Sequence, residues 1–149
     1  MRTQQYRGDY RLKIIALWTA FLLGMLFHTP LALMPLFHGL SVAHSHTHDY
    51  LPLNTLFGLM LGLFGIAMAA IVTTALVNGQ RYKTLHFGLT LLYTAINGSH
   101  LIFDVLVGVP SYLLCRMGYL LIMGLLLNVV AFQWFDSESN KQPVLRSVH

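Results

Sequence analysis

Four long apolar stretches account for most of this chain of 149 residues and limit the folds open to it. They are Ile14–Phe37, Leu51–Val77, Leu85–Val107 and Tyr112–Phe135, and each is near or above the about 20 residues that a helix needs to cross a bilayer. Only 9% of the residues are charged, against about 25% in a typical soluble domain. The pattern predicts an all-α protein in the lipid bilayer, a four-transmembrane-helix bundle with up-down-up-down topology.

We expect a single domain over residues 1–135, followed by a disordered cytoplasmic tail over residues 136–149. The predicted helices lie near residues 14–37, 51–77, 82–107 and 111–135. In the first of them, Pro30 and Pro35 predict a kink or a broken last turn, because proline lacks the backbone N–H and clashes with the preceding turn.

The second predicted helix carries small residues on one face. These residues are Gly58, Gly62, Gly65 and Ala69. Small residues let the backbones of membrane helices approach closely. We therefore expect this face to pack against a neighbouring helix.

Basic residues cluster at the helix ends and predict the orientation of the chain. They are Arg2, Arg7, Arg11 and Lys13 before the first stretch, Arg81 and Lys83 between the second and third, and Lys141 and Arg146 after the last. By the positive-inside rule, this multi-pass protein has both termini in the cytoplasm. We expect Trp18 and Trp134 to form part of an aromatic belt at the inner membrane interface. A formal charge of +4 arranged in this way does not indicate a nucleic-acid partner.

A polar stripe runs along the third predicted helix. At about 100° per residue, its members fall within about 40° of one line. They are His86, Thr90, Tyr93, Asn97, His100 and Asp104. Such a stripe cannot face lipid, so we expect it to face the interior of the bundle and any functional site there.

Most of the histidines gather toward the outer side of the predicted bundle and favour a transition-metal site. We expect its core to be His28, His100 and Asp104, with His38 next and His44, His46 and His48 of the outer loop as auxiliary ligands. His100 and Asp104 are four residues apart and share a helix face. Imidazole and carboxylate ligands suit copper, zinc or nickel.

Two other chemistries stay open for the same residues. Haem b needs two imidazoles facing each other across a bundle, and His28 and His100 lie at similar predicted depth. A chlorophyll needs only one axial histidine. The polar stripe could also conduct protons or ions, since chains of ionisable residues occur in pumps and relays.

The alternative to all of these is a structural role. Buried polar residues often hold membrane helices together, and Asp104 could form an ion pair with Arg116. The chain would then be a structural or assembly subunit of a homo-oligomer or a larger membrane complex. An enzyme is not favoured, because the sequence has no nucleotide-binding glycine loop, nucleophile elbow or HExxH motif. The single cysteine excludes an intramolecular disulfide and a thiolate zinc cage.

Several segments resemble a group of small, uncharacterised four-helix integral membrane proteins of cyanobacterial type. The likeness rests on segments 13–18, 27–39, 86–90 and 124–134, which read KIIALW, FHTPLALMPLFHG, HFGLT and GLLLNVVAFQW. It covers most of the hydrophobic chain. The resemblance implies a four-helix protein of a photosynthetic or plasma membrane and carries no activity.

Overall fold

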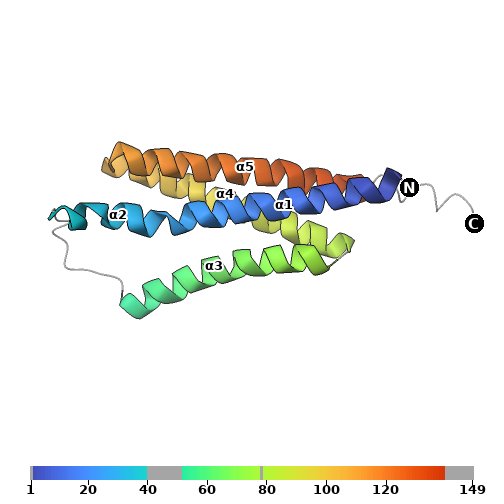
Figure 1. Cartoon of the computed structure of the whole chain (residues 1–149), viewed down its shortest axis with the longest axis horizontal. Helices are drawn as coiled ribbons and strands as arrows, with labels where there is room; N and C mark the ends of the chain where they lie inside the picture. Colours follow the sequence, from blue (N-terminus) through green and yellow to red (C-terminus); the bar gives the residue numbers. More distant parts are fainter. Residues whose placement is uncertain (1, 40–51, 78, 140–149) are drawn as a thin grey trace, which may run out of the picture.

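Helices make up nearly all of the described chain (Figure 1). The computed structural model describes residues 2–39, 52–77 and 79–139. Within them it has no strand, and the helices are α1 (Arg2–Leu26), α2 (His28–Phe37), α3 (Leu53–Leu76), α4 (Gln80–Val107) and α5 (Ser111–Ser139). The prediction of an all-α fold is confirmed.

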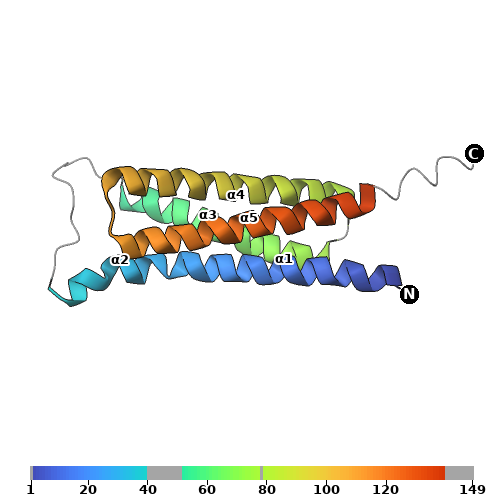
Figure 2. The same cartoon turned by 90° about the horizontal axis from the view of Figure 1, so that it is seen from above.

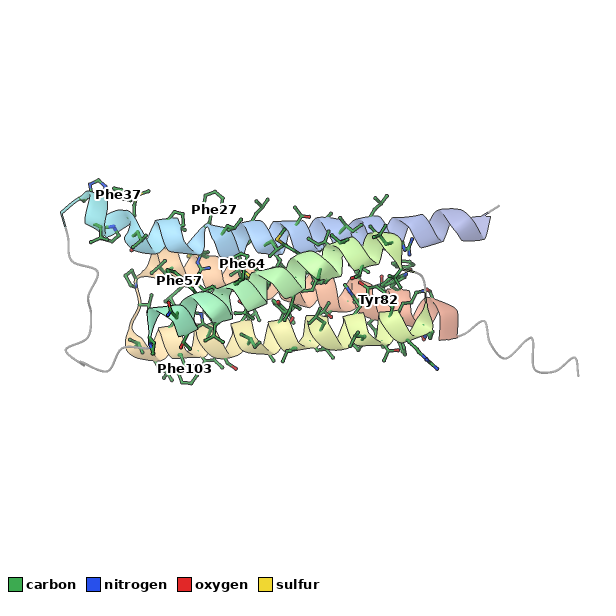
Figure 3. All side chains as sticks on the ribbon, turned by 90° about the horizontal axis from the view of Figure 1, so that it is seen from below. Phe27, Phe37, Phe57, Phe64, Tyr82 and Phe103 are labelled. Atoms are coloured by element: carbon green, nitrogen blue, oxygen red, sulfur yellow. The ribbon has the colours of Figure 1, made fainter. Side chains whose placement is uncertain are left out.

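Three helices in the described residues are long and apolar enough to cross a membrane. They are Phe57–Leu76 of α3, Gln80–Val107 of α4 and Ser111–Ser137 of α5. Large apolar side chains on their surfaces are exposed, including Leu61, Phe103 and Phe132. Figure 3 shows Phe103, on α4, and Phe27 and Phe37, on the first part of the chain, directed away from the other helices. This apolar exterior is compatible with contact with a lipid bilayer.

The first apolar stretch forms two helices rather than one. Hydrogen bonds continue up to the junction, where the Phe27 N–H donates to Leu23 O at 3.1 Å and the Leu31 N–H donates to Phe27 O at 3.2 Å. Pro30 lies in the first turn of α2, where its missing N–H is tolerated. A break therefore occurs one turn before Pro30, and α2 continues α1 with a small change of direction (Figure 2), whereas Pro35 lies inside α2 without breaking its last turn.

Both ends of the helical region extend beyond the predicted limits. α1 begins at Arg2 and includes the basic residues that precede the first apolar stretch. α5 continues to Ser139, so the first residues assigned to the tail are helical. The rest of the tail, residues 140–149, lies outside the described residues.

The turn between α4 and α5 follows from Gly108 and Pro110. Gly108 ends α4 in the left-handed conformation, with φ of 75°, which glycine adopts without steric cost. The Val109 N–H donates back to Asp104 O at 3.1 Å. Pro110 then accepts the Leu113 N–H at 2.9 Å and starts α5.

Close backbone packing occurs where α5 meets α1 and α4. A methyl group at Gly24 would lie 2.8 Å from Leu120 Cδ2, and one at Gly124 would lie 2.8 Å from Thr94 Oγ1. Both distances are too short for van der Waals contact. Glycine at these two positions therefore sets how closely α5 approaches its neighbours.

The predicted packing of the small-residue face of α3 is wrong. Its four members, Gly58, Gly62, Gly65 and Ala69, are all exposed, and no described atom lies within 4 Å of a methyl group built on any of the three glycines. The reason is the tilt of α3, which diverges from the other helices toward its N-terminal end (Figure 1) and crosses obliquely between α4 and α1 (Figure 3).

Replacing Gly124 with alanine is expected to destabilise the protein by about 1–3 kcal/mol, the usual cost of overpacking. The Thr94 hydroxyl cannot easily move away, because it donates to Thr90 O at 2.9 Å and accepts from Asn128 Nδ2 at 3.0 Å. Gly62→Ala is the matched control and should be neutral or slightly stabilising, because alanine favours the helix. Thermal unfolding in detergent measures both. Equal unfolding temperatures for the two variants would contradict the prediction.

Tyrosine side chains connect α3 to α4. The Tyr82 hydroxyl donates to Ala70 O at 3.1 Å, and the Tyr93 hydroxyl donates to Leu63 O. The closest backbone packing of α3 is with α1 instead. Side chains of this size hold α3 and α4 apart, and this spacing leaves room for a cavity at the end where α3 diverges.

Candidate functional site

His86 lies in a buried aromatic cluster near the start of α4. The Trp18 Nε1–H, which can only donate, lies 3.3 Å from His86 Nε2. The other ring nitrogen, Nδ1, faces the Tyr82 hydroxyl at 3.3 Å and the Thr74 hydroxyl at 3.5 Å. Nε2 must therefore accept, so a neutral His86 carries its proton on Nδ1. Because both nitrogens are engaged, His86 fits a structural role better than that of a metal or tetrapyrrole ligand.

The two tryptophans expected at the membrane interface belong to this cluster instead. Trp18 and Trp134 are 0% and 1% exposed, and their ring centroids lie 6.1 Å and 5.9 Å from that of His86. Burial therefore contradicts a lipid-facing aromatic belt for both residues, whereas their expected depth near the inner interface stays a prediction. Both indole rings instead pack against the imidazole ring of His86 inside the protein.

Lys83 is a buried residue that the sequence analysis assigned only to a basic helix end. It is 1% exposed. Its Nζ donates to Trp134 O at 3.4 Å and lies 4.8 Å from the centre of the Trp134 ring, a cation–π distance. One signal was present in the sequence, because Lys83 precedes His86 by three residues and so lies at the edge of the polar stripe.

The middle of the stripe is buried, and each of its three side chains donates a hydrogen bond to a backbone carbonyl. Thr90, Tyr93 and Asn97 are all buried. The Thr90 hydroxyl donates to Phe87 O at 2.8 Å, and Asn97 Nδ2 donates to Tyr93 O at 2.8 Å. Tyr93 donates to α3 in the same way. These bonds fix the orientation of the three side chains, and the Tyr93 bond joins α4 to α3.

Three members of the stripe, Tyr93, Asn97 and His100, line a cavity of about 560 Å³. The wall is largely apolar, with three methionines and two phenylalanines among its residues. Exposed residues such as Phe57, Ile96 and His100 show that the cavity opens to the surface of the protein. The lining residues are Met25, Leu33, Phe57, Met60, Leu63, Phe64, Tyr93, Ile96, Asn97, His100, Arg116, Met117 and Leu120.

Polar groups enter this cavity from α4 and α5. His100 and Asn97 belong to α4, and Arg116 belongs to α5. Asp104 is not a lining residue, but its negative charge attracts the Arg116 guanidinium. Each of these residues was predictable from the sequence, whereas the cavity and its methionines were not. Methionine is flexible and polarisable and suits the wall of a binding site for an apolar ligand.

The proposed metal ligands do not form a site among the described side chains. No group of three His, Cys, Asp or Glu side chains that could share an ion occurs there. His38 is exposed at the C-terminal end of α2. The side chain of His28, the first residue of α2, lies outside the described part of the chain, as do His44, His46 and His48.

Comparisons with known proteins found no match for this chain among family models, curated proteins or solved structures. Its function is therefore inferred from its own residues and their arrangement.

Proposed function

We propose that this chain is a four-span membrane protein with up-down-up-down topology, in which α1 and α2 together form the first span. Three spans are supported by the length and apolar character of α3, α4 and α5. For the first span, Ile14–Phe37 is long enough for the hydrocarbon core, and the Phe27 and Leu31 backbone hydrogen bonds keep the chain helical around the junction. Continuous helix is what a span requires where no water can bind the backbone.

Both termini of the protein are proposed to lie in the cytoplasm. Basic residues of α1 and α4 bind backbone carbonyls at the ends of other helices, since Arg11 Nη2 donates to Val77 O after α3 and Lys83 Nζ donates to Trp134 O of α5. The start of α1 and the end of α5 lie at one end of the molecule (Figure 1). Under the positive-inside rule, the basic end faces the cytoplasm.

Cysteine labelling tests this orientation. In a background where exposed Cys115 is replaced by serine, we expect Ser45→Cys to react with a membrane-impermeant maleimide from outside the cell. Ser139→Cys should react only after the membrane is permeabilised. Each single-cysteine variant is a control for the other. The reverse pattern would show that the proposed orientation is wrong.

The cavity between the helices is proposed to bind a tetrapyrrole, haem b or a chlorin, with His100 as the axial ligand. The observation that carries this proposal is the size and chemistry of the cavity. Its volume of about 560 Å³ is within the range of about 300–1,000 Å³ for small-molecule and cofactor pockets. A largely apolar wall with a histidine suits a flat apolar ring whose central metal takes an imidazole.

A bare metal ion fits this cavity less well. An ion needs three or four convergent ligands, and the described side chains offer no such group. His100 and Asp104 remain the basis for the copper, zinc or nickel proposal, which would require His28, His38 or the loop histidines to complete the site.

A visible absorption spectrum tests the proposed ligand. We expect the purified protein, or the protein titrated with iron protoporphyrin IX, to show a Soret band that saturates at one ring per chain. Metal analysis of the same sample is the second measurement. A colourless protein with stoichiometric copper, zinc or nickel would favour the ion site instead. A protein that binds neither would favour a structural or assembly subunit.

A further inference from the structure

Arg116 is poorly satisfied by the protein around it. Its Nη2 donates to the Met117 thioether sulfur at 2.9 Å, which is a weak acceptor. Its Nε is buried and has no hydrogen-bond partner among the described residues. A guanidinium has five N–H donors, and buried donors without strong acceptors cost free energy. The guanidinium therefore has hydrogen-bonding capacity that the described residues do not use and that an anion could satisfy.

Arg116 also lies between two spaces. In addition to the cavity of about 560 Å³, it lines a second one of about 350 Å³ beside Gly24, Phe27 and Tyr119, where α1 meets α5. An anionic group could approach the guanidinium from either space. Asp104 attracts Arg116, but its carboxylate leaves the arginine Nε unpaired.

We propose that Arg116 binds a carboxylate of the cavity ligand, so that the site selects free-acid tetrapyrroles over esterified ones. This inference rests on the proposed function and adds the ligand class to it. A planar guanidinium can donate two parallel hydrogen bonds to the two oxygens of one carboxylate. The apolar wall of the cavity holds the ring while Arg116 neutralises its acidic edge. A chlorophyll, whose side-chain acid is esterified, would lack this group.

Titration with matched ligands tests the proposal. The probes are iron protoporphyrin IX, which has two free carboxylates, and its dimethyl ester. We expect the wild-type protein to bind the free acid at least about tenfold more tightly, the value of a hydrogen bond to a charged group. Equal affinities would overturn the inference and leave the proposed function standing. Failure to bind either probe, together with a purified protein that contains no chlorin by its visible spectrum, would overturn both.

Substitutions at single residues show which side chain causes the preference for the free acid. Arg116→Gln should lower the affinity for the free acid to that for the ester, with ester affinity unchanged as evidence of folding. Arg116→Lys should keep part of the preference. Arg81→Gln, at an exposed position in the first turn of α4, is the control and should keep all of it. An undiminished preference in Arg116→Gln would overturn the inference.

Asp104→Asn provides a test that does not alter Arg116. Removing the competing carboxylate should increase the preference for the free acid, and an unchanged or smaller preference would contradict the proposal even if Arg116→Gln failed to fold. Adding phosphatidylglycerol to the neutral detergent distinguishes a second source of anion. The preference should survive this addition, whereas its loss would show that a lipid headgroup is the partner of Arg116.

Discussion

Replacing His100 with alanine is expected to lower tetrapyrrole affinity by more than about a hundredfold, since even the outer-shell partners of metal ligands contribute about 10–100-fold. The reason is that His100 is the histidine described in the cavity wall. The Soret maximum should also move, because the proposed imidazole ligand of the bound metal would be removed. Spectroscopic titration with iron protoporphyrin IX measures both changes.

Added imidazole separates loss of the ligand from loss of the fold. Imidazole in the buffer should restore the Soret position of His100→Ala, because the truncated side chain leaves space for it in the cavity. His38→Ala distinguishes the two proposed sites, since His38 lies at the exposed end of α2 and does not line the cavity. It should leave tetrapyrrole binding unchanged. Lower metal content in His38→Ala, with no effect of His100→Ala on colour, would favour the ion site.

Replacing His86 with alanine is expected to destabilise the protein by about 2–4 kcal/mol. The change opens a void in the buried cluster and leaves the Trp18 N–H without its acceptor. It also removes the partner of Tyr82 and Thr74. Because Trp18 and Trp134 both lie against the histidine ring, tryptophan fluorescence reports unfolding by heat or denaturing detergent at this place.

Two further variants show whether the effect comes from the buried network. Trp18→Phe removes the donor but keeps a smaller ring, so it should cost about 1–3 kcal/mol through the unsatisfied His86 Nε2 and the space left by the indole. Thr84→Ala, at an exposed position on the same helix, should change stability by no more than about 0.5 kcal/mol. Tetrapyrrole affinity should be unaffected in folded His86→Ala. A variant of normal stability that no longer binds the ring would instead identify His86 as a ligand.

The sequence by itself was enough to predict features that depend on local composition. Unbroken apolar runs of about 20 residues have the length of a membrane helix, which satisfies its own backbone, so the all-α fold was predictable without knowledge of any contact. Pro30 lacks a backbone donor wherever it lies, which made the break in the first stretch predictable as well. The polar face of α4 was visible because helical periodicity alone places His86, Thr90 and Asn97 on one side.

Only the tertiary structure decided which neighbour each helix face meets. The tilt of α3 leaves Gly58 and Gly62 exposed, while Gly24 and Gly124 make the close contacts of α5. The contact of α4 with α3 is equally non-local, because the Tyr93 hydroxyl donates to the α3 backbone from 30 residues away in sequence. Helical periodicity specifies a direction around one axis and contains no information on distance to another helix.

The candidate site also combines residues that were predictable from the sequence with an arrangement that was not. His100 and Arg116 were visible as polar residues in apolar stretches, where such residues carry a cost and so indicate a role. That the two residues share one cavity follows from the packing of α4 against α5 and from the divergence of α3. The pairing of Trp18 with His86 joins residues 68 positions apart. Contacts of this kind are set by how complete helices pack, which no local pattern encodes.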